Sequence, residues 1–240
     1  MNARKQTFEL ALELRQVEEA VSCVFHTLLL HRSVGKFQYQ AEGNYSIGVV
    51  GTEDVDCHFI DLTYVRVNSR ELVELVARDA IAFRDALRLS SSAAQQALFS
   101  VEFYQKKRRQ WPLSEDAVPW EIWHFAFDVL HLSNETEFEK LREAVGECLG
   151  DIVFSICGSV NRPQLYLPKM PVQSDLSLIF NDQLQEIQPY LFRSHHEIGT
   201  VPTGSGRKPG SRSSTQDLMV GSPTGLGTTV KKLIKDTISM

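Results

Sequence analysis

The chain has 240 residues, of which 42% are hydrophobic and 23% charged, a balance typical of a globular protein with a core of its own. The formal net charge of −5 gives no global field that would draw the chain onto nucleic acid or anionic lipid.

We expect the sequence to lack an export signal and a membrane span. Its first residues alternate charged and apolar side chains, without the apolar stretch of a signal peptide. No uninterrupted apolar run approaches the roughly 18 residues that a bilayer span requires. The cysteines stand singly, at Cys23, Cys57, Cys148 and Cys157. We therefore expect a reducing compartment, most simply the cytosol.

The first half of the chain is predicted to form a strand, a helix, a group of strands and a second helix. Apolar and polar residues alternate between Phe8 and Arg15, the period of a half-buried strand. A buried central helix follows, and residues 36–67 predict two or three strands around 45–50 and 59–67. Asn68 or Ser69 can cap the next helix. Its apolar seam recurs at helical spacing: Leu72, Val76, Ala80, Phe83 and Leu87.

The second half predicts a pair of strands, a long helix and an extended segment. Residues 99–103 and 123–129 alternate as antiparallel strands, joined by a polar connector from Lys106 to Pro119. Ser133 or Asn134 opens the longest helix. This helix should end at Arg162, because the residue before proline avoids the helical region. Residues 165–192 are predicted to form an extended, proline-rich wrap.

This order segregates helices from antiparallel strands, so the predicted class is α+β. Residues 199–228 contain hardly any large apolar groups. Since they cannot offset their ordering entropy, we expect them to be disordered. Residues 229–240 are expected to form a short amphipathic segment that carries a set of apolar side chains, Val230, Leu233, Ile234 and Ile238.

Candidate catalytic and metal-binding residues are few. Cys57 and His58 are adjacent on a predicted strand and so point to opposite faces, which disfavours a nucleophile–base dyad. His26 and His31 are five apart on a helix and share a face poorly. The pair at 195–196 has no further ligand at metal spacing. We predict no catalytic residue, no cofactor and no metal site.

Two charged clusters have structural interpretations. Glu53, Asp54 and Asp56 crowd a stretch that is predicted to be a turn. The basic run at 106–109 is short, and the rest of the chain is acidic, so we interpret it as the flank of a solvated loop rather than a nucleic-acid site.

The connector contains Trp111, Pro112 and Leu113, bracketed by charged residues. Proline fixes its own φ and biases Trp111 toward an extended conformation, so the side chains are presented rather than wound into a helix. Burying an aromatic ring removes roughly 150–250 Å² from water, on the order of 4–6 kcal/mol at most. Two interpretations stay open: Trp111 anchors a partner, or it anchors the loop against its own domain.

Five separated strings of the sequence carry a family resemblance: LLHRSVGKFQYQAEGNYSIGVVGTEDVDCHFIDLTYVRV, EFYQKKRRQWPLSEDAVPWEIW, YLPKMPVQSD, IQPYLF and KKLIKDT. Together, and in this order, they resemble the autophagy-related protein 101 family. The similarity covers residues 1–192 and resumes over the last ten or so. Residues 199–228 look like an insertion relative to that family.

The resemblance implies a single HORMA domain over residues 1–198, with three main helices packed on an antiparallel sheet and a C-terminal seatbelt-like wrap. It implies a non-catalytic adaptor required for autophagosome formation, part of the autophagy-initiation (Atg1/Unc-51-like) kinase complex. Such a chain pairs with and stabilises the HORMA domain of autophagy-related protein 13. It works beside the kinase and scaffold subunits, in the cytoplasm and at the phagophore assembly site.

The resemblance also implies two recruiting segments. A protruding Trp-Phe loop of the family recruits downstream factors, and Trp111 stands at its Trp position, with Pro112 next and Leu113 in place of the Phe. The terminal segment from Val230 to Ile238 is implied to bind other autophagy factors, including a lipid-kinase complex.

Two alternatives are carried forward. A HORMA-type adaptor of a chromatin or checkpoint pathway would clasp a partner peptide with its seatbelt. A small cytosolic hydrolase would use Cys57 or a His as its working group, and would need a thiol pKa well below the ordinary value.

Overall fold

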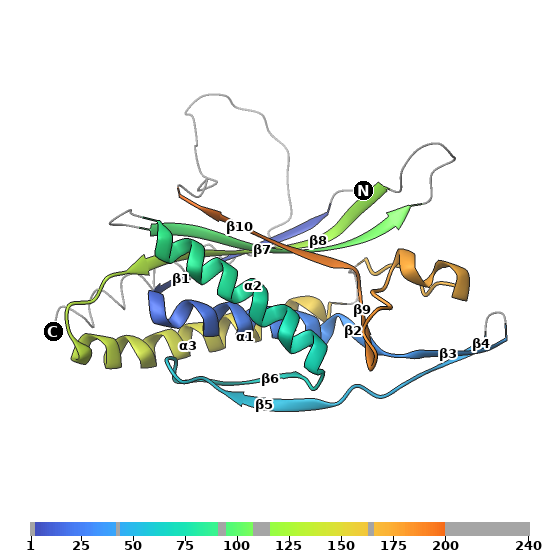
Figure 1. Cartoon of the computed structure of the whole chain (residues 1–240), viewed down its shortest axis with the longest axis horizontal. Coiled ribbons are helices and arrows are strands. Elements are labelled where there is room, and N and C mark those ends of the chain that lie inside the picture. The colour runs from blue at the N-terminus through green and yellow to red at the C-terminus, as the bar shows by residue number, and fades with distance from the viewer. Residues whose placement is uncertain (1–2, 42–43, 91–94, 108–115, 163–165, 200–240) are drawn as a thin grey trace, which may run out of the picture.

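The computed structural model describes residues 3–41, 44–90, 95–107, 116–162 and 166–199 (Figure 1). Its main sheet has the order β1-β8-β7-β10, formed by Arg4–Glu13, Asp116–Leu130, Gln95–Lys107 and Phe192–Ile198. Three helices lie beneath one face of this sheet: α1 (Val17–His31), α2 (Arg70–Leu89) and α3 (Glu135–Val160). A two-stranded sheet of β5 (Thr52–Asp56) and β6 (Thr63–Val67) packs below the helices, with β6 against α1. The α+β class is confirmed.

The main sheet is mixed, so the expectation of an antiparallel sheet is wrong in one place. Strands β7 and β8 pair antiparallel, as predicted. Strand β1, however, runs parallel to β8, from Arg4 opposite Glu121 to Glu13 opposite Leu130. The period-two pattern of a strand reports which face is buried and carries no information on the direction of its neighbour.

The region 36–67 holds more strands than predicted. It follows β2 (Ser33–Gly35) and contains β3 (Phe37–Ala41), β4 (Asn44–Ile47), β5 (Thr52–Asp56) and β6 (Thr63–Val67). Glu53 and Asp56 lie in β5 rather than in a turn. Glu53 is paired with Arg66 at 2.7 Å, and the Asp56 carboxylate accepts a hydrogen bond from the Thr63 hydroxyl at 2.6 Å.

The helices follow the predicted periods closely. A short 3-10 helix, Leu14–Gln16, separates β1 from α1, whose central burial is confirmed. The Asn134 side chain caps α3 by accepting from the Glu137 N–H at 2.8 Å, and the helix ends at Val160. The predicted seam of α2 is fully buried, namely Leu72, Val76, Ala80, Phe83 and Leu87.

The wrap contains more structure than predicted. A 3-10 helix (Gln173–Leu178) precedes β9 (Ile187–Pro189), which pairs with β2. Strand β10 then joins the main sheet antiparallel to β7. The residue pattern signals β10 only weakly, because its outward positions are charged and only its two ends carry large apolar residues. The predictions of disorder over 199–228, beyond Gly199, and of an amphipathic segment over 229–240 lie outside the described residues.

A buried ion pair ties three parts of the chain together. Arg32 follows α1 and is 3% exposed, and Glu121 of β8 is 2% exposed. The guanidinium donates to both carboxylate oxygens, at 3.0 and 2.8 Å, and Trp123 Nε1 donates to the same carboxylate at 2.8 Å. The backbone N–H of Tyr190, in the wrap, donates to the Arg32 carbonyl at 2.9 Å.

Helix α3 touches the segment between β5 and β6 so closely that only glycine fits at the contact. A Cβ at Gly146 would stand 2.4 Å from the Asp61 carbonyl oxygen, and Asp61 N donates to the Arg142 carbonyl at 3.3 Å. The missing side chain therefore lets this segment lie directly on α3.

We predict that Gly146→Ala lowers the free energy of unfolding by roughly 1–3 kcal/mol, since backbone must move to admit the methyl group. Gly158→Ala is the matched control in the same helix, because a Cβ there meets nothing within 4 Å. It should raise stability by about 0.5–1 kcal/mol through helix propensity. Urea denaturation of both variants gives the comparison, and two changes of the same sign would contradict the tight contact.

Candidate interaction surfaces

The predicted interaction loop, Trp111, Pro112 and Leu113, lies outside the described residues, but both of its roots are placed. Strands β7 and β8 stay paired to Lys107 opposite Asp116. The connector predicted from Lys106 to Pro119 is therefore shorter, and the loop begins from the end of a long hairpin. The C-terminal candidates Val230, Leu233, Ile234 and Ile238 also lie outside the described part of the chain.

An apolar strip lies beside the roots of this loop. It consists of side chains that are 40–46% exposed: Tyr166, Leu167, Met170 and Val172. Pro168 and Pro171, between them, are buried. The Tyr166 hydroxyl is hydrogen-bonded to Gln105 Oε1 of β7 at 3.3 Å, and its ring lies 6.5 Å from that of Trp120 in β8. The strip is thereby fixed to the base of the hairpin.

The hairpin β3–β4 supports the other end of the strip. Phe37, Tyr39 and Tyr45 form an aromatic cluster with ring centroids 5.3–5.9 Å apart. The Tyr39 hydroxyl donates to the Pro171 carbonyl at 3.3 Å. An aromatic hairpin and a proline-rich segment, distant in the sequence, are joined here into one surface.

A second surface lies on α3. Phe154 is 78% exposed, although it belongs to a helix whose opposite face is the buried seam. Exposed Glu147 and Asp151 lie on the same face, and Gly150 and Gly158 flank the ring one turn away on either side. Sequence reasoning missed Phe154, although its place midway between the seam residues Ile152 and Ile156 puts it on the far side of the helix.

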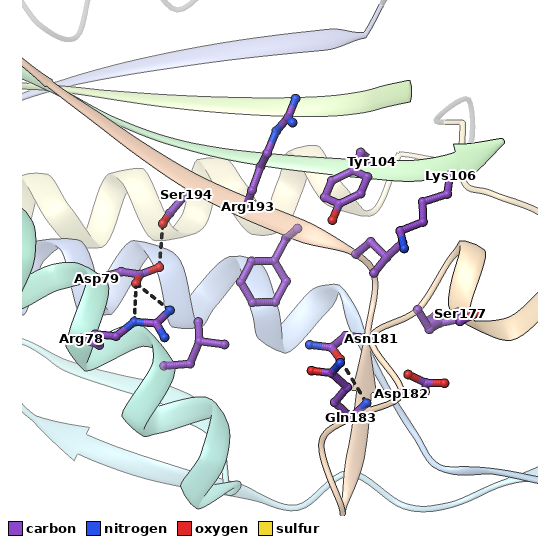
Figure 2. A pocket seen from close by; sticks show the side chains of 14 residues that line it. Arg78, Asp79, Tyr104, Lys106, Ser177, Asn181, Asp182, Gln183, Arg193 and Ser194 are labelled. Atoms are coloured by element: carbon purple, nitrogen blue, oxygen red, sulfur yellow. Dashed lines mark hydrogen bonds and ion pairs between the residues drawn. The ribbon is translucent and has the colours of Figure 1, made fainter. Parts of the chain in front are cut away.

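A cleft of about 560 Å³ separates α2 from the start of β10, with the segment 181–183 and the end of β7 completing its wall (Figure 2). The Ser194 hydroxyl donates to Asp79 Oδ2 at 2.6 Å, and Asp79 also pairs with Arg78 at 3.0 Å. The described lining residues include neither cysteine nor histidine. These interactions bind β10 to α2.

Comparison with known proteins decides the family. The sequence model of the family described as Autophagy-related protein 101 matches residues 9–174. The chain is 45% identical to Autophagy-related protein 101 of Xenopus tropicalis and 44% identical to that of Homo sapiens, each over 240 residues that cover 100% of both chains. It is 24% identical to that of Arabidopsis thaliana over 183 residues, 68% of this chain and 78% of the relative.

The chain belongs to the autophagy-related protein 101 family. The resemblance seen in the five strings is confirmed, and with it a role in autophagy. Within the described ranges, none of the helices has the length and apolar character that crossing a bilayer requires.

Cys57, the nucleophile of the hydrolase alternative, has the opposite of the required chemistry in this family member. It lies after β5, outside any strand, so the strand argument against a Cys57–His58 dyad was wrong in its premise. Burial, and then the nearby Glu19 carboxylate, raises the pKa of the Cys57 thiol to about 12. The same carboxylate accepts from the His58 and Phe59 N–H groups at 2.8 Å, which fixes this loop to α1.

The histidines also lie in settings that favour their neutral forms or separate them. Burial lowers the pKa of His26 to about 4. His31 Nε2 lies 3.3 Å from Cys157 Sγ, a contact that joins α1 to α3 and that the sequence did not suggest. Burial lowers the pKa of His31 and raises that of Cys157, so the pair is held neutral. His195 points outward from β10, whereas His196 packs 5.5 Å from the ring of Phe83.

We predict that Cys57 in the native protein is alkylated by iodoacetamide at pH 7.5 at least about a hundredfold more slowly than in urea, because little of it is thiolate. Peptide mass mapping after timed quenching measures the rate at Cys57 itself. The unfolded protein is the control, and equal rates in the two states would restore the case for a reactive cysteine.

Proposed function

We propose that this chain is a non-catalytic HORMA-domain adaptor of the autophagy-initiation kinase complex, which pairs with the HORMA domain of autophagy-related protein 13. Membership in the autophagy-related protein 101 family supports the pathway. The observation that carries the adaptor role is the presence of two separate exposed apolar surfaces, one on α3 and one at the strip. A large exposed ring on a folded domain is the kind of group that anchors an interface.

The α3 surface is the proposed face for the partner HORMA domain. Phe154 supplies the aromatic anchor, and Gly158, one turn away, lets a partner backbone approach the helix, since a Cβ there meets nothing within 4 Å. Glu147 and Asp151 give the rim a negative charge, which fits a partner with basic residues around an apolar recess.

The Trp111 loop and the apolar strip together are the proposed face for downstream factors. The strip is fixed to β7 and β8 at the base of the hairpin that carries Trp111. A factor that covers Trp111 and Leu113 would find Tyr166 and Leu167 next to the roots of the loop. An anchoring side chain surrounded by further apolar contacts is the usual arrangement of an energetic hot spot.

Further parts of the proposal follow from the family. The chain would act in the cytoplasm and, on induction, at the phagophore assembly site beside the kinase and scaffold subunits. The wrap from 165 to 192, whose strand β9 pairs with β2, would serve as the seatbelt. The terminal segment with Val230, Leu233, Ile234 and Ile238 would contact a lipid-kinase complex.

We predict that Phe154→Ala weakens binding to the HORMA domain of autophagy-related protein 13 at least about thirtyfold, the loss expected of an aromatic hot spot. Leu89→Ala is the matched control, since Leu89 is 86% exposed at the end of α2. Titration calorimetry of the two purified variants measures the difference. Equal affinities would show that α3 is not the pairing face.

We predict that Trp111→Ala changes the free energy of unfolding by less than about 1 kcal/mol, the usual range for a surface substitution. Recruitment of downstream factors should fall, while binding to the HORMA partner stays intact. Thermal unfolding and pull-down from autophagy-induced cells are the two measurements. A large loss of stability would instead identify Trp111 as an internal anchor of its loop.

A further inference from the structure

Strand β10 is one of the two edge strands of the main sheet, with β1 at the other edge, and its register shows which of its backbone groups are used. It pairs with β7 from Phe192 opposite Phe103 to Ile198 opposite Ala97. At the two ends of this pairing, the Leu191 carbonyl accepts from Tyr104 N at 3.0 Å and Gly199 N donates to the Gln96 carbonyl at 2.9 Å.

Alternate residues of an antiparallel strand turn their amides to opposite sides. The odd-numbered residues of β10 therefore bond β7, and the even-numbered ones turn their N–H and C=O groups to the open edge: Phe192, Ser194, His196 and Ile198. Among the described residues, no strand pairs with this edge.

This edge has few of the features that prevent strands from pairing. Strand β10 contains no proline, and its pairing with β7 shows no bulge. The Ser194 side chain donates a hydrogen bond to Asp79 of α2 (Figure 2). This bond fixes β10 to the helix layer and uses none of the backbone groups along the open edge. A straight, rigid row of unused amides is a template for another strand.

The outward side chains of β10 show what kind of strand fits. They are Arg193, His195 and Glu197. If these had one sign, they would repel a second copy of β10. Instead Arg193 is positive and Glu197 is negative, and each lies two residues from His195. When two copies of β10 pair antiparallel about His195, each Arg193 therefore faces a Glu197 of the other copy.

We propose that β10 is a homodimerisation edge: two copies of this chain pair antiparallel through it, about a two-fold axis at His195. In this register Ser194 of each copy exchanges backbone bonds with His196 of the other, and Phe192 does so with Ile198. Arg193 of each copy then lies opposite Glu197 of the other, which makes the charge pair twice.

Dimers in which one copy of β10 is shifted along the other pair these charges less well. Because only even-numbered residues have free amides, a symmetric shift moves the axis to Ser194 or to His196. The first shift places Arg193 opposite His195, and the second places Arg193 beyond the end of the partner strand. Only the axis at His195 overlaps the whole of β10 and pairs both charges.

Within one chain, the Glu197 carboxylate remains accessible to a residue of a second copy. It stands opposite Leu98 on β7, and its described ion-pair partner is the exposed His195 of the same strand, at 3.4 Å. Arg193 already pairs with Glu102 on β7 and would bridge two carboxylates in the dimer. The edge is a different element from the α3 surface, so the homodimer and the proposed heterodimer can be tested separately.

The test is sedimentation velocity of the full chain from about 1 to about 300 µM, since a single pair of strands buries little area and binds weakly. We expect reversible dimerisation. Glu197→Arg should raise the dissociation constant at least about tenfold, or about 1.4 kcal/mol, because both symmetric pairs become repulsive. Arg193→Glu should do the same, although it also puts a second carboxylate beside Glu102, so Glu197→Arg is the cleaner variant.

The decisive experiment mixes the Glu197→Arg and Arg193→Glu variants. An equimolar mixture of the two single variants should associate about as well as the unchanged protein, because each pair between positions 193 and 197 is restored with its signs matched. Lys5→Glu, a charge reversal on β1 of the same sheet, is the control and should leave the dissociation constant unchanged. Amide exchange should slow with concentration at Phe192, Ser194, His196 and Ile198.

A chain that stays monomeric over the whole range overturns the proposal. So does a dimer that both single variants form normally, or two variants that fail to associate when mixed. Binding of each variant to the HORMA domain of autophagy-related protein 13 reports that its fold is intact.

Discussion

The buried pair of Arg32 and Glu121 is the interaction on which the arrangement of the chain depends. Two charges at 3% and 2% exposure persist only because each is fully paired, and removal of one partner of such a pair costs about 3–5 kcal/mol. The pair fixes the end of α1 to β8. Through the bond from Tyr190 to the Arg32 carbonyl, it also sets where the wrap crosses the molecule.

The position of the wrap then determines where two exposed surfaces lie, the apolar strip before Tyr190 and the open edge of β10 after it. Upstream of Tyr190, the strip from Tyr166 to Val172 meets β7, β8 and the aromatic hairpin. Downstream of it, β10 reaches β7 and becomes the edge of the main sheet. An internal ion pair with strict geometry holds these surfaces in a fixed relation, whereas apolar contacts alone would allow sliding.

The same fold buries, in whole or in part, cysteine and histidine side chains that the hydrolase alternative would use. The thiol of Cys57 and the rings of His26 and His31 are shifted toward their neutral forms by burial. The phenylalanine side chains are found both inside and outside the core. Phe25, Phe83 and Phe99 pack in the core, while Phe154 is exposed on the surface.

The order of residues alone was enough to specify the three helices, the β7–β8 hairpin and the family. The spacing of Leu72, Val76 and Phe83 specified α2, and the alternation of β7 and β8 specified their hairpin, because both periods record which side of an element is buried. The parallel direction of β1, the place of β10 and the exposure of Phe154 emerged only from the packed chain. Those features depend on which distant segment supplies the neighbour, and a period within one segment holds no information about the identity or direction of its partner.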